Sequence, residues 1–169
     1  MFNLIISIIA IALVVVLAGA SLYYGGDAFN KGSESAKAST YINQAQQVQA
    51  AATLFKSANG GFPTNLAALT TGGYMASAPK LPTGTGSWEV DPTVGVAHVT
   101  QAVSASAKTG ITLNICNSVN DNGAGVVACV AKGTDLATTV SAGLQIDLDA
   151  APTSTTTNTA TDVTVFMKL

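Results

Sequence analysis

The side chains that could perform chemistry in this chain are few and widely spaced. Cys116 and Cys129 are the only cysteines, with 12 residues between them, and His98 is the only histidine. Zinc needs about four ligands, more than these three residues supply, and a redox-active pair normally lies much closer in sequence. We therefore expect a structural disulfide between Cys116 and Cys129, worth roughly 3 kcal/mol in the chain-entropy model. A disulfide implies an oxidising compartment.

The remaining titratable side chains do not predict a reaction. Glu89 and Asp91, and likewise Asp147 and Asp149, alternate along predicted strands, where carboxylates are usually surface charges and too few oxygens cluster to hold calcium. His98 lies among alternating Val and Ala, which is typical of a surface strand residue and not of a ligand. The chain has no G-x-S-x-G, P-loop, H-E-x-x-H or G-x-G-x-x-G motif. We expect no catalytic, cofactor or metal site, and no enzymatic activity.

The element around which the chain is organised is its first segment, residues 1–24, which carries no charged side chain. This run exceeds the ~18 residues that indicate a membrane-spanning helix, so we expect burial in lipid, among other subunits, or in both. A secretory signal peptide is one alternative, with residues 17–20 as a weak cleavage site, but the run does not open with positive charge. A plain membrane anchor is another, with Lys31 and Lys37 as the nearest flanking cations.

Composition limits the function of the remaining chain. Of the 169 residues only 9% are charged, the net charge is −2 and arginine is absent. This low charge excludes a basic nucleic-acid-binding surface of the usual kind. About 140 residues follow the apolar run, enough for one modest core. The abundance of Ala, Thr, Ser, Gly and Val favours a closely packed, exported, β-rich domain over a cytosolic enzyme.

Residues 28–58 show the periodicity of an amphipathic helix. Apolar side chains recur at spacings of three and four: Tyr41, Ile42, Ala45, Val48, Ala52 and Phe55. Residues 59–61, Asn-Gly-Gly, suit a left-handed helix cap, and Pro63 follows as a stop signal.

The apolar run and the amphipathic segment predict one helix over residues 1–57, roughly 85 Å long at 1.5 Å per residue. Gly25 and Gly26 each cost about 1 kcal/mol in a helix interior. Because helical periodicity of the apolar residues resumes after them, we interpret the pair as a weak point within the helix and not as its end. We expect a projecting apolar half-helix over residues 1–27 and a globular domain over residues 28–169.

The rest of the chain predicts a small antiparallel β-sheet, and the fold class is therefore α+β. A short helical turn is expected within residues 62–78, capped by Thr64 or Asn65. A hairpin is expected through the turn at residues 91–93, whereas residues 111–119 fit a strand and a short helix equally well. The predicted strands are 87–90, 94–103, 126–130, 143–148 and 163–169, and the Thr-rich tract 152–161 is expected to be an exposed loop.

These features together resemble the type IV pilins, and the type IVb and conjugative-pilus pilins in particular. The resemblance rests on the apolar half-helix, an amphipathic half that ends in "SANGGFP", the "TGGYMASAPKLPTGTGSW" loop, the β-rich domain and the late cysteine pair. The overall plan covers the whole chain, although the identifying motifs are short.

The resemblance implies how the chain is processed and assembled. A prepilin peptidase would remove a short basic leader and methylate the new N-terminus, which would be Met1. The subunit would reside in the bacterial inner membrane, and assembly machinery driven by a cytoplasmic ATPase would then build an extracellular helical filament of identical copies. The implied partners are other copies, the membrane and this machinery; the implied roles include cell adhesion, and no nucleic-acid contact is evident.

The resemblance also implies where copies meet. The apolar half-helices would bundle in the filament core through Phe2, Ile5, Ile6, Ile9, Leu13, Val15, Val16 and Leu17. At Gly25 and Gly26 the backbone most easily leaves the helical state, and we expect a helix break within residues 19–32 of the assembled subunit; the alternative is that both glycines only permit close packing.

One residue departs from the family pattern. Most type IV pilins carry Glu at the fifth mature position, where this chain has Ile5. Either the filament sets its register without that charge, or Met1 is not the mature start. A pseudopilin of a type II secretion system and a simple membrane-anchored β-rich domain remain as alternative functions; major pseudopilins usually bind calcium in a C-terminal loop, which this sequence does not predict.

Overall fold

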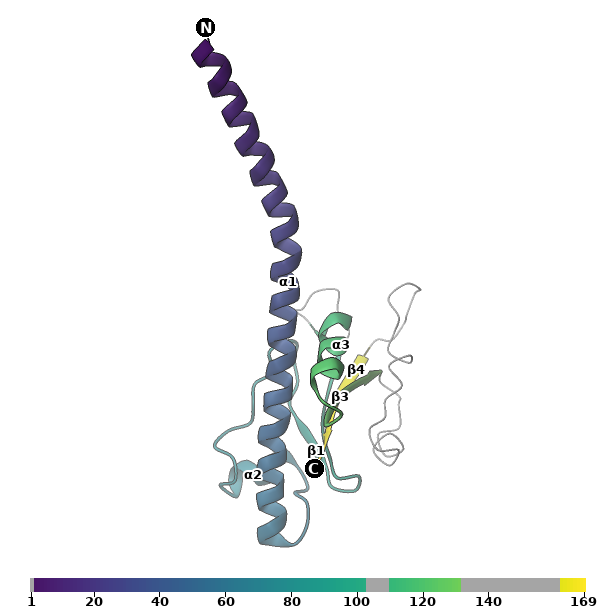
Figure 1. Ribbon diagram of the computed structural model, residues 1–169. Helices are drawn as coiled ribbons and strands as arrows, with labels where there is room; N and C mark the ends of the chain where they lie inside the picture. Colours follow the sequence, from purple (N-terminus) through teal and green to yellow (C-terminus); the bar gives the residue numbers. More distant parts are fainter. Residues whose placement is uncertain (1, 103–109, 132–161) are drawn as a thin grey trace. The chain divides into compact units, whose positions relative to one another are not determined.

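The structure is a computed structural model that describes residues 2–102, 110–131 and 162–169 (Figure 1). The chain divides into two compact units, one ending at Ser33 and the other beginning at Glu34. Three helices and four strands are described: α1 Phe2–Asn59, α2 Leu66–Thr71, β1 Glu89–Asp91, β2 Val96–Ala102, α3 Leu113–Asn122, β3 Val127–Ala131 and β4 Asp162–Lys168.

Helix α1 is continuous through Gly25 and Gly26, which confirms the interpretation that these glycines do not end it. The helix stops where the sequence predicts. Gly60 adopts a φ of 78°, in the left-handed region that favours glycine. Its N–H donates to the Lys56 carbonyl oxygen over 2.8 Å, which satisfies one of the carbonyls exposed at a helix end.

The four strands form one antiparallel sheet in the order β1-β2-β4-β3. The predicted hairpin is confirmed, with Glu89 opposite His98. Its turn is held by Asp91, whose Oδ1 accepts from the Thr93 N–H over 2.8 Å. This hydrogen bond holds the pKa of the half-buried Asp91 carboxyl below its usual value. Strand β4 pairs with β2 on one side and β3 on the other.

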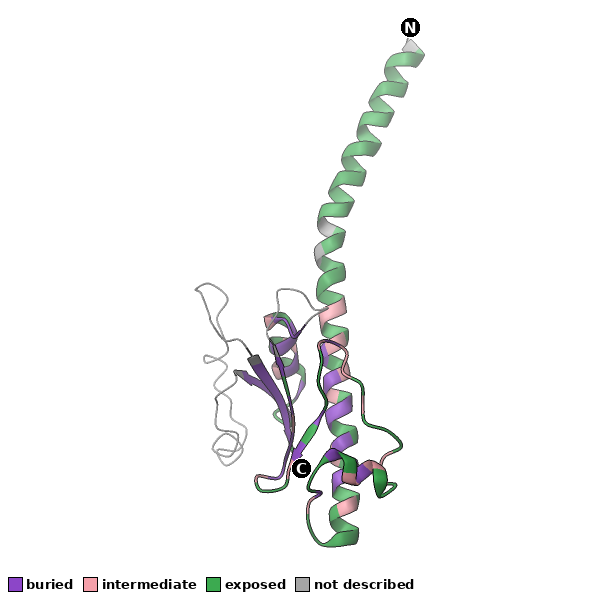
Figure 2. Cartoon of the chain, turned by 180° about the vertical axis from the view of Figure 1, so that it is seen from behind, coloured by how far each residue is buried: buried purple, intermediate pink, exposed green. Residues whose placement is uncertain are grey.

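One face of the sheet builds the main core against the helices. Most of the buried residues that α1 contributes lie at helical spacings of three and four: Ala38, Tyr41, Ala45, Val48 and Ala52. In Figure 2 these purple positions appear only in the second half of α1. They belong to the same cluster as Val99 of β2, Val127 of β3 and Val165 of β4. The predicted amphipathic helix is therefore confirmed, because the period of its apolar residues matches the face that packs on the sheet.

The segment that fitted strand and helix equally well is helical. Thr112 caps α3, its hydroxyl accepting from the Ile115 N–H over 3.2 Å, and Ile115, Cys116 and Val119 share one buried face. Helix α2 is capped in the same way by Asn65, one of the two caps predicted for it. In both cases a cap satisfies N–H groups that the first helical turn leaves open.

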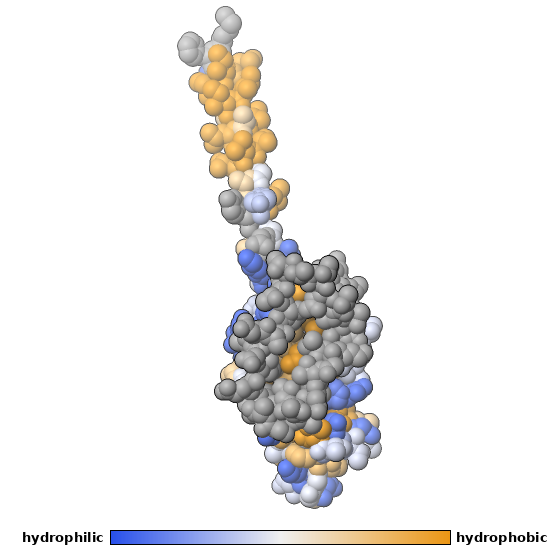
Figure 3. All heavy atoms as spheres, turned by 90° about the vertical axis from the view of Figure 1, so that its right-hand side faces the viewer, coloured by the Kyte–Doolittle hydropathy of each residue, from blue (hydrophilic) through white to orange (hydrophobic). Residues whose placement is uncertain are grey.

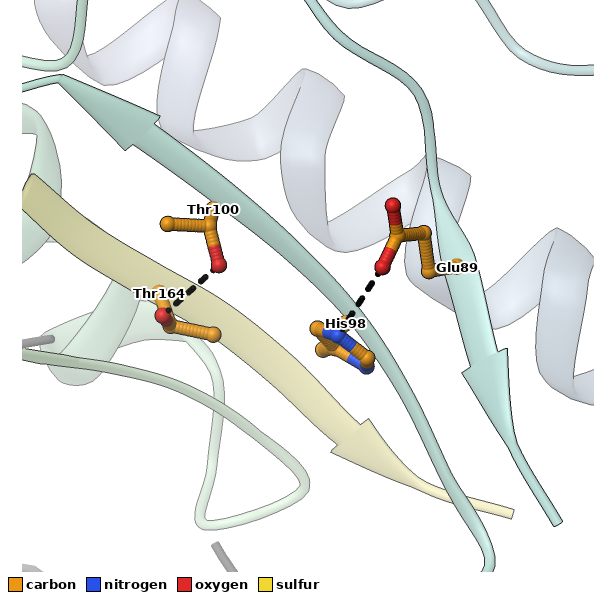
Figure 4. Close-up of polar contacts among 4 residues, drawn as sticks. All are labelled: Glu89, His98, Thr100 and Thr164. Atoms are coloured by element: carbon orange, nitrogen blue, oxygen red, sulfur yellow. Dashed lines mark hydrogen bonds and ion pairs between the residues drawn. The ribbon is translucent and has the colours of Figure 1, made fainter. Parts of the chain in front are cut away.

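The other face of the sheet carries a smaller apolar cluster and several polar pairs. Val96, Ala128, Val130 and Phe166 are buried together on it. Beside them the hydroxyls of Thr100 and Thr164 lie 3.0 Å apart, and His98 Nε2 lies 3.4 Å from Glu89 Oε2 (Figure 4). The side chain of His98 is 20% exposed, so the expectation of a surface strand residue is met in part: the ring lies against the sheet and pairs with its hairpin neighbour.

Four expectations lie outside the described residues. They are the strand at 143–148, the Thr-rich loop at 152–161, the pair Asp147 and Asp149, and the processed terminus Met1.

The predicted disulfide is present between Cys116 of α3 and Cys129 of β3, with the two Cα atoms 5.4 Å apart.

Replacing both cysteines with serine is expected to lower the free energy of unfolding by about 3 kcal/mol, because the unfolded chain regains the entropy of an open loop. Chemical denaturation of the wild type with and without reductant, beside the double variant, measures this loss. The intact mass of the purified chain should rise by that of two hydrogens on reduction. Free thiols that alkylate without reductant would contradict the prediction.

Candidate assembly surface

The unit that ends at Ser33 consists of helix and exposes large apolar side chains. Of the residues expected to form a filament core, seven are more than half exposed: Ile5, Ile6, Ile9, Leu13, Val15, Val16 and Leu17. Their exposed fractions run from 55% for Ile5 to 70% for Val16. Phe2 is helical, and its side chain lies outside the described set. Figure 3 shows this surface as a continuous apolar region on the first part of α1.

Sequence reasoning named only part of this surface. Other large apolar side chains on the same stretch are equally exposed: Leu4, Ile8, Ile11, Val14 and Leu22. At about 100° per residue these positions fill the remaining directions around the helix. Plotting the run on a helical wheel would have found them. We define the apolar segment as residues 4–22; it has no polar side that could face water while the other side packs.

The polar side chains within the apolar segment are satisfied internally. The Ser7 hydroxyl donates to the Asn3 carbonyl oxygen and the Ser21 hydroxyl to that of Leu17, both over 2.9 Å. Hydroxyls bonded four residues back in this way leave no unmet donor when a helix enters an apolar environment. From Asn3 onward α1 is long and apolar enough to cross a membrane, a criterion that a signal sequence also meets.

Gly25 and Gly26 are exposed and helical, and a Cβ atom added at either would have no neighbour within 4 Å. Neither glycine is therefore required by close packing within a single chain. The helix break within residues 19–32, and its alternative of close helix packing, concern an assembled subunit and stay predictions.

We still expect the backbone to leave the helical state within residues 19–32 after assembly. Extended chain covers ~3.3 Å per residue against 1.5 Å in a helix, so a break would let the apolar segments and the globular units pack in separate registers. A filament map at side-chain resolution measures this directly. Unbroken helical hydrogen bonding from Leu4 to Phe55 would contradict it.

In the second unit, buried polar contacts fix α1 to the loop that precedes the sheet. Gln44 lies within the core, where its Nε2 donates to the Lys80 carbonyl oxygen over 2.6 Å and its Oε1 accepts from Trp88 Nε1 over 3.0 Å. The Tyr41 and Thr83 hydroxyls lie 2.8 Å apart. Burial raises the pKa of the Tyr41 hydroxyl, and the hydrogen bond with Thr83 partly opposes this.

Helix α3 is also tied to α1. The Glu34 carboxylate accepts from the Thr112 hydroxyl over 2.8 Å and from Asn114 Nδ2 over 3.0 Å. A carboxylate at this end of α3 is favoured by the partial positive charge of a helix N-terminus. Glu34 thus holds α3 at its first turn, and the disulfide from Cys116 holds it one turn later.

The last turn of α3 covers the outer edge of β3. Asn120 Oδ1 accepts from the Cys129 N–H over 2.7 Å, and Asn120 Nδ2 donates to the Cys129 carbonyl oxygen over 3.1 Å. The Val127 N–H donates to the Gly123 carbonyl oxygen over 3.2 Å. A Cβ added at Gly123 would overlap the Val127 carbonyl oxygen, so this approach requires glycine. Covered edges protect a sheet against pairing with strands of other molecules, and these contacts cover the β3 edge at Val127 and Cys129.

Replacing Asn120 with alanine is expected to lower the free energy of unfolding by about 1–3 kcal/mol, because the part-buried Cys129 N–H and carbonyl lose their partners. Asn122→Ala is the matched control, since Asn122 is exposed and its amide donates to the Ser118 carbonyl oxygen within the same helix. Urea denaturation of the two variants measures the difference. Equal stability of the two would show that the Asn120 contacts contribute nothing.

Within the described ranges no group of three or more His, Cys, Asp or Glu side chains is placed to hold a metal ion. His98 Nδ1 is buried without a hydrogen-bond partner among those residues, and His98 Nε2 lies 3.4 Å from the Glu89 carboxylate. No family model, curated protein or solved structure matches this chain. The function is therefore argued from the apolar segment and the unit that follows it.

Proposed function

We propose that this chain is a pilin-type structural subunit that polymerises through its apolar N-terminal helix into an extracellular filament. Before assembly the apolar segment is held in the membrane. In the filament the same segment is buried among other copies, and the β-rich unit forms the outer layer. The role is structural and involves no catalysis.

The observation that carries this proposal is the exposure of the apolar segment on the same helix that supplies the core of the second unit. The large apolar side chains from Leu4 to Leu22 are more than half exposed, whereas Tyr41, Ala45 and Val48 are fully buried. Burial of apolar surface is favourable by ~25 cal/mol per Å², so this segment requires lipid or protein around it. The continuous amphipathic half and the exported, disulfide-bonded domain also match the plan of a pilin subunit.

A simple membrane anchor would account for the apolar segment alone. It would not require a helix that continues without a linker through Asn59 into the core of the domain. A polymer uses both parts of this helix, because the apolar segment is buried among copies and the amphipathic half belongs to the core of the second unit.

Negative-stain microscopy of material sheared from the surface of producing cells tests the proposal. We expect filaments of ~60–90 Å width, the size of a helical core with a layer of domains on each side. Mass spectrometry should identify this chain in them, and cells that lack its gene provide the control. A chain that stays in the membrane fraction, with no filaments, would support the anchor and overturn the proposal.

A further inference from the structure

The second unit begins at Glu34, and the stretch of α1 directly before it gains little from burial. The described residues from Gly25 to Gly32 are exposed. Three of the residues in this stretch, Gly25, Gly26 and Gly32, are of the type that favours a helix least after proline. A backbone opens locally at the lowest cost where helix propensity is low and few side chains are buried. Opening of α1 is therefore easiest between residues 25 and 32.

Glu34 extends the packed face of α1 by one turn. It lies four residues before Ala38, which is fully buried, and residues four apart share a helix face. Both carboxylate oxygens are engaged: Oε1 accepts from the Thr112 hydroxyl over 2.8 Å and Oε2 from Asn114 Nδ2 over 3.0 Å. Hydrogen bonds to a carboxylate are stronger than those between neutral groups. This turn of α1 is thus held by α3.

The partners of Glu34 are themselves attached to the sheet. Thr112 is buried, and its hydroxyl also accepts from the Ile115 N–H over 3.2 Å. One turn further along α3, Cys116 is bonded to Cys129 of β3. Because α3 is attached to β3 in this way, Glu34 leaves it only by breaking both hydrogen bonds.

We propose that Glu34 is the residue at which opening of α1 stops. A helix gains one hydrogen bond for each residue added, so it also opens residue by residue from a weak point. Opening that starts at the glycines spreads toward Ala38 until a contact outside the helix adds to its cost. The two hydrogen bonds of Glu34 are that contact, and the core from Ala38 onward stays closed while the stretch before it opens. The inference goes beyond the proposed function, because it concerns a single chain.

Hydrogen–deuterium exchange of the full chain in detergent micelles, measured by mass spectrometry of its peptides, tests this proposal. In an α-helix the N–H of residue 38 bonds to the carbonyl of residue 34, so amides from 38 onward report on the helix beyond Glu34. In the wild type we expect fast exchange at residues 29–33 and slow exchange at residues 38–41. In Glu34→Ala, residues 38–41 should exchange about tenfold faster, which corresponds to 1.4 kcal/mol, because two hydrogen bonds to a carboxylate are lost. Alanine favours a helix more than glutamate does, so helix propensity alone would slow this exchange.

Three further variants identify the contact. Ser35→Ala changes the exposed neighbour of Glu34 and should leave exchange at residues 38–41 unchanged. Asn114→Ala should give part of the effect from the side of α3. The double variant Glu34→Ala/Asn114→Ala should exchange no faster than Glu34→Ala, because both substitutions remove the same contact.

The outcomes decide the proposal without reference to filaments. Equal exchange at residues 38–41 in the wild type and Glu34→Ala would overturn it, since the buried core alone would then limit the opening. Slow exchange at residues 29–33 of the wild type would also overturn it, because there would be no opening to stop. Residues 45–52 should keep the wild-type exchange rate in Glu34→Ala, and an equal rise there would show loss of the fold in place of local opening. The proposed function depends on the presence of filaments, which none of these results changes.

Discussion

Replacing Ile9 with aspartate is expected to abolish filament formation. Ile9 lies within the apolar segment and is 59% exposed, so in a membrane or a helical bundle it meets only apolar neighbours. A charge near the middle of an inserted helix costs about 2.5–3.5 kcal/mol on insertion scales, and none of the residues from Leu4 to Leu22 is charged to pair with it. Val15→Asp should act in the same way.

The measurement is filament yield after shearing, with Ile9→Leu as the matched control because it keeps the apolar character and volume. Proteolysis should show that the second unit of Ile9→Asp resists digestion as the wild type does, since its core residues begin at Ala38. Normal filament yield from either aspartate variant would rule out a core of bundled apolar helices.

Replacing Trp88 with alanine should give the largest loss of stability in the second unit. Trp88 is 1% exposed and belongs to the main core. Truncating a buried tryptophan leaves a cavity and typically costs about 3–5 kcal/mol. Gln44 Oε1 would also lose the hydrogen bond that it accepts from Trp88 Nε1, inside a core where an unmet acceptor is costly.

Urea denaturation followed by circular dichroism measures the effect in the full chain. Trp88→Phe separates the two contributions: it keeps a ring and loses the hydrogen bond, so we expect a smaller loss of about 1–3 kcal/mol. Ser87→Ala, at the exposed neighbour, should leave stability nearly unchanged. An alanine variant at position 88 that unfolds at the wild-type urea concentration would contradict this account of the core.

Local signals in the sequence were enough to predict several elements. Helix α1 and its end at Asn59 follow from periodicity and from the Gly-rich cap, and the hairpin follows from its Asp-Pro-Thr turn. These features depend on neighbours within a few residues. The disulfide followed from the shortage of other ligands for Cys116 and Cys129.

The features that the sequence did not predict depend on distant residues. Residues 111–119 match two periods locally, and the helix is settled by the Thr112 cap and by Glu34, 78 residues earlier. The position of β4 between β2 and β3 could not be predicted either, because the alternation of apolar and polar residues predicts a strand but not the strands with which it pairs. Of the candidate surface, the apolar run was readable from hydropathy alone.

The position of β4 has a consequence for the order of events in biosynthesis. Both of its long edges are paired, with β2 and with β3, yet it is the last of the four strands along the chain. A chain that is synthesised from its N-terminus can form the β1–β2 hairpin and close the Cys116–Cys129 loop early. The sheet itself stays open until residues 162–168 have emerged. The described sheet is therefore completed only when the last residues of the chain are available, and a chain that ends before residue 162 lacks the strand that joins β2 to β3.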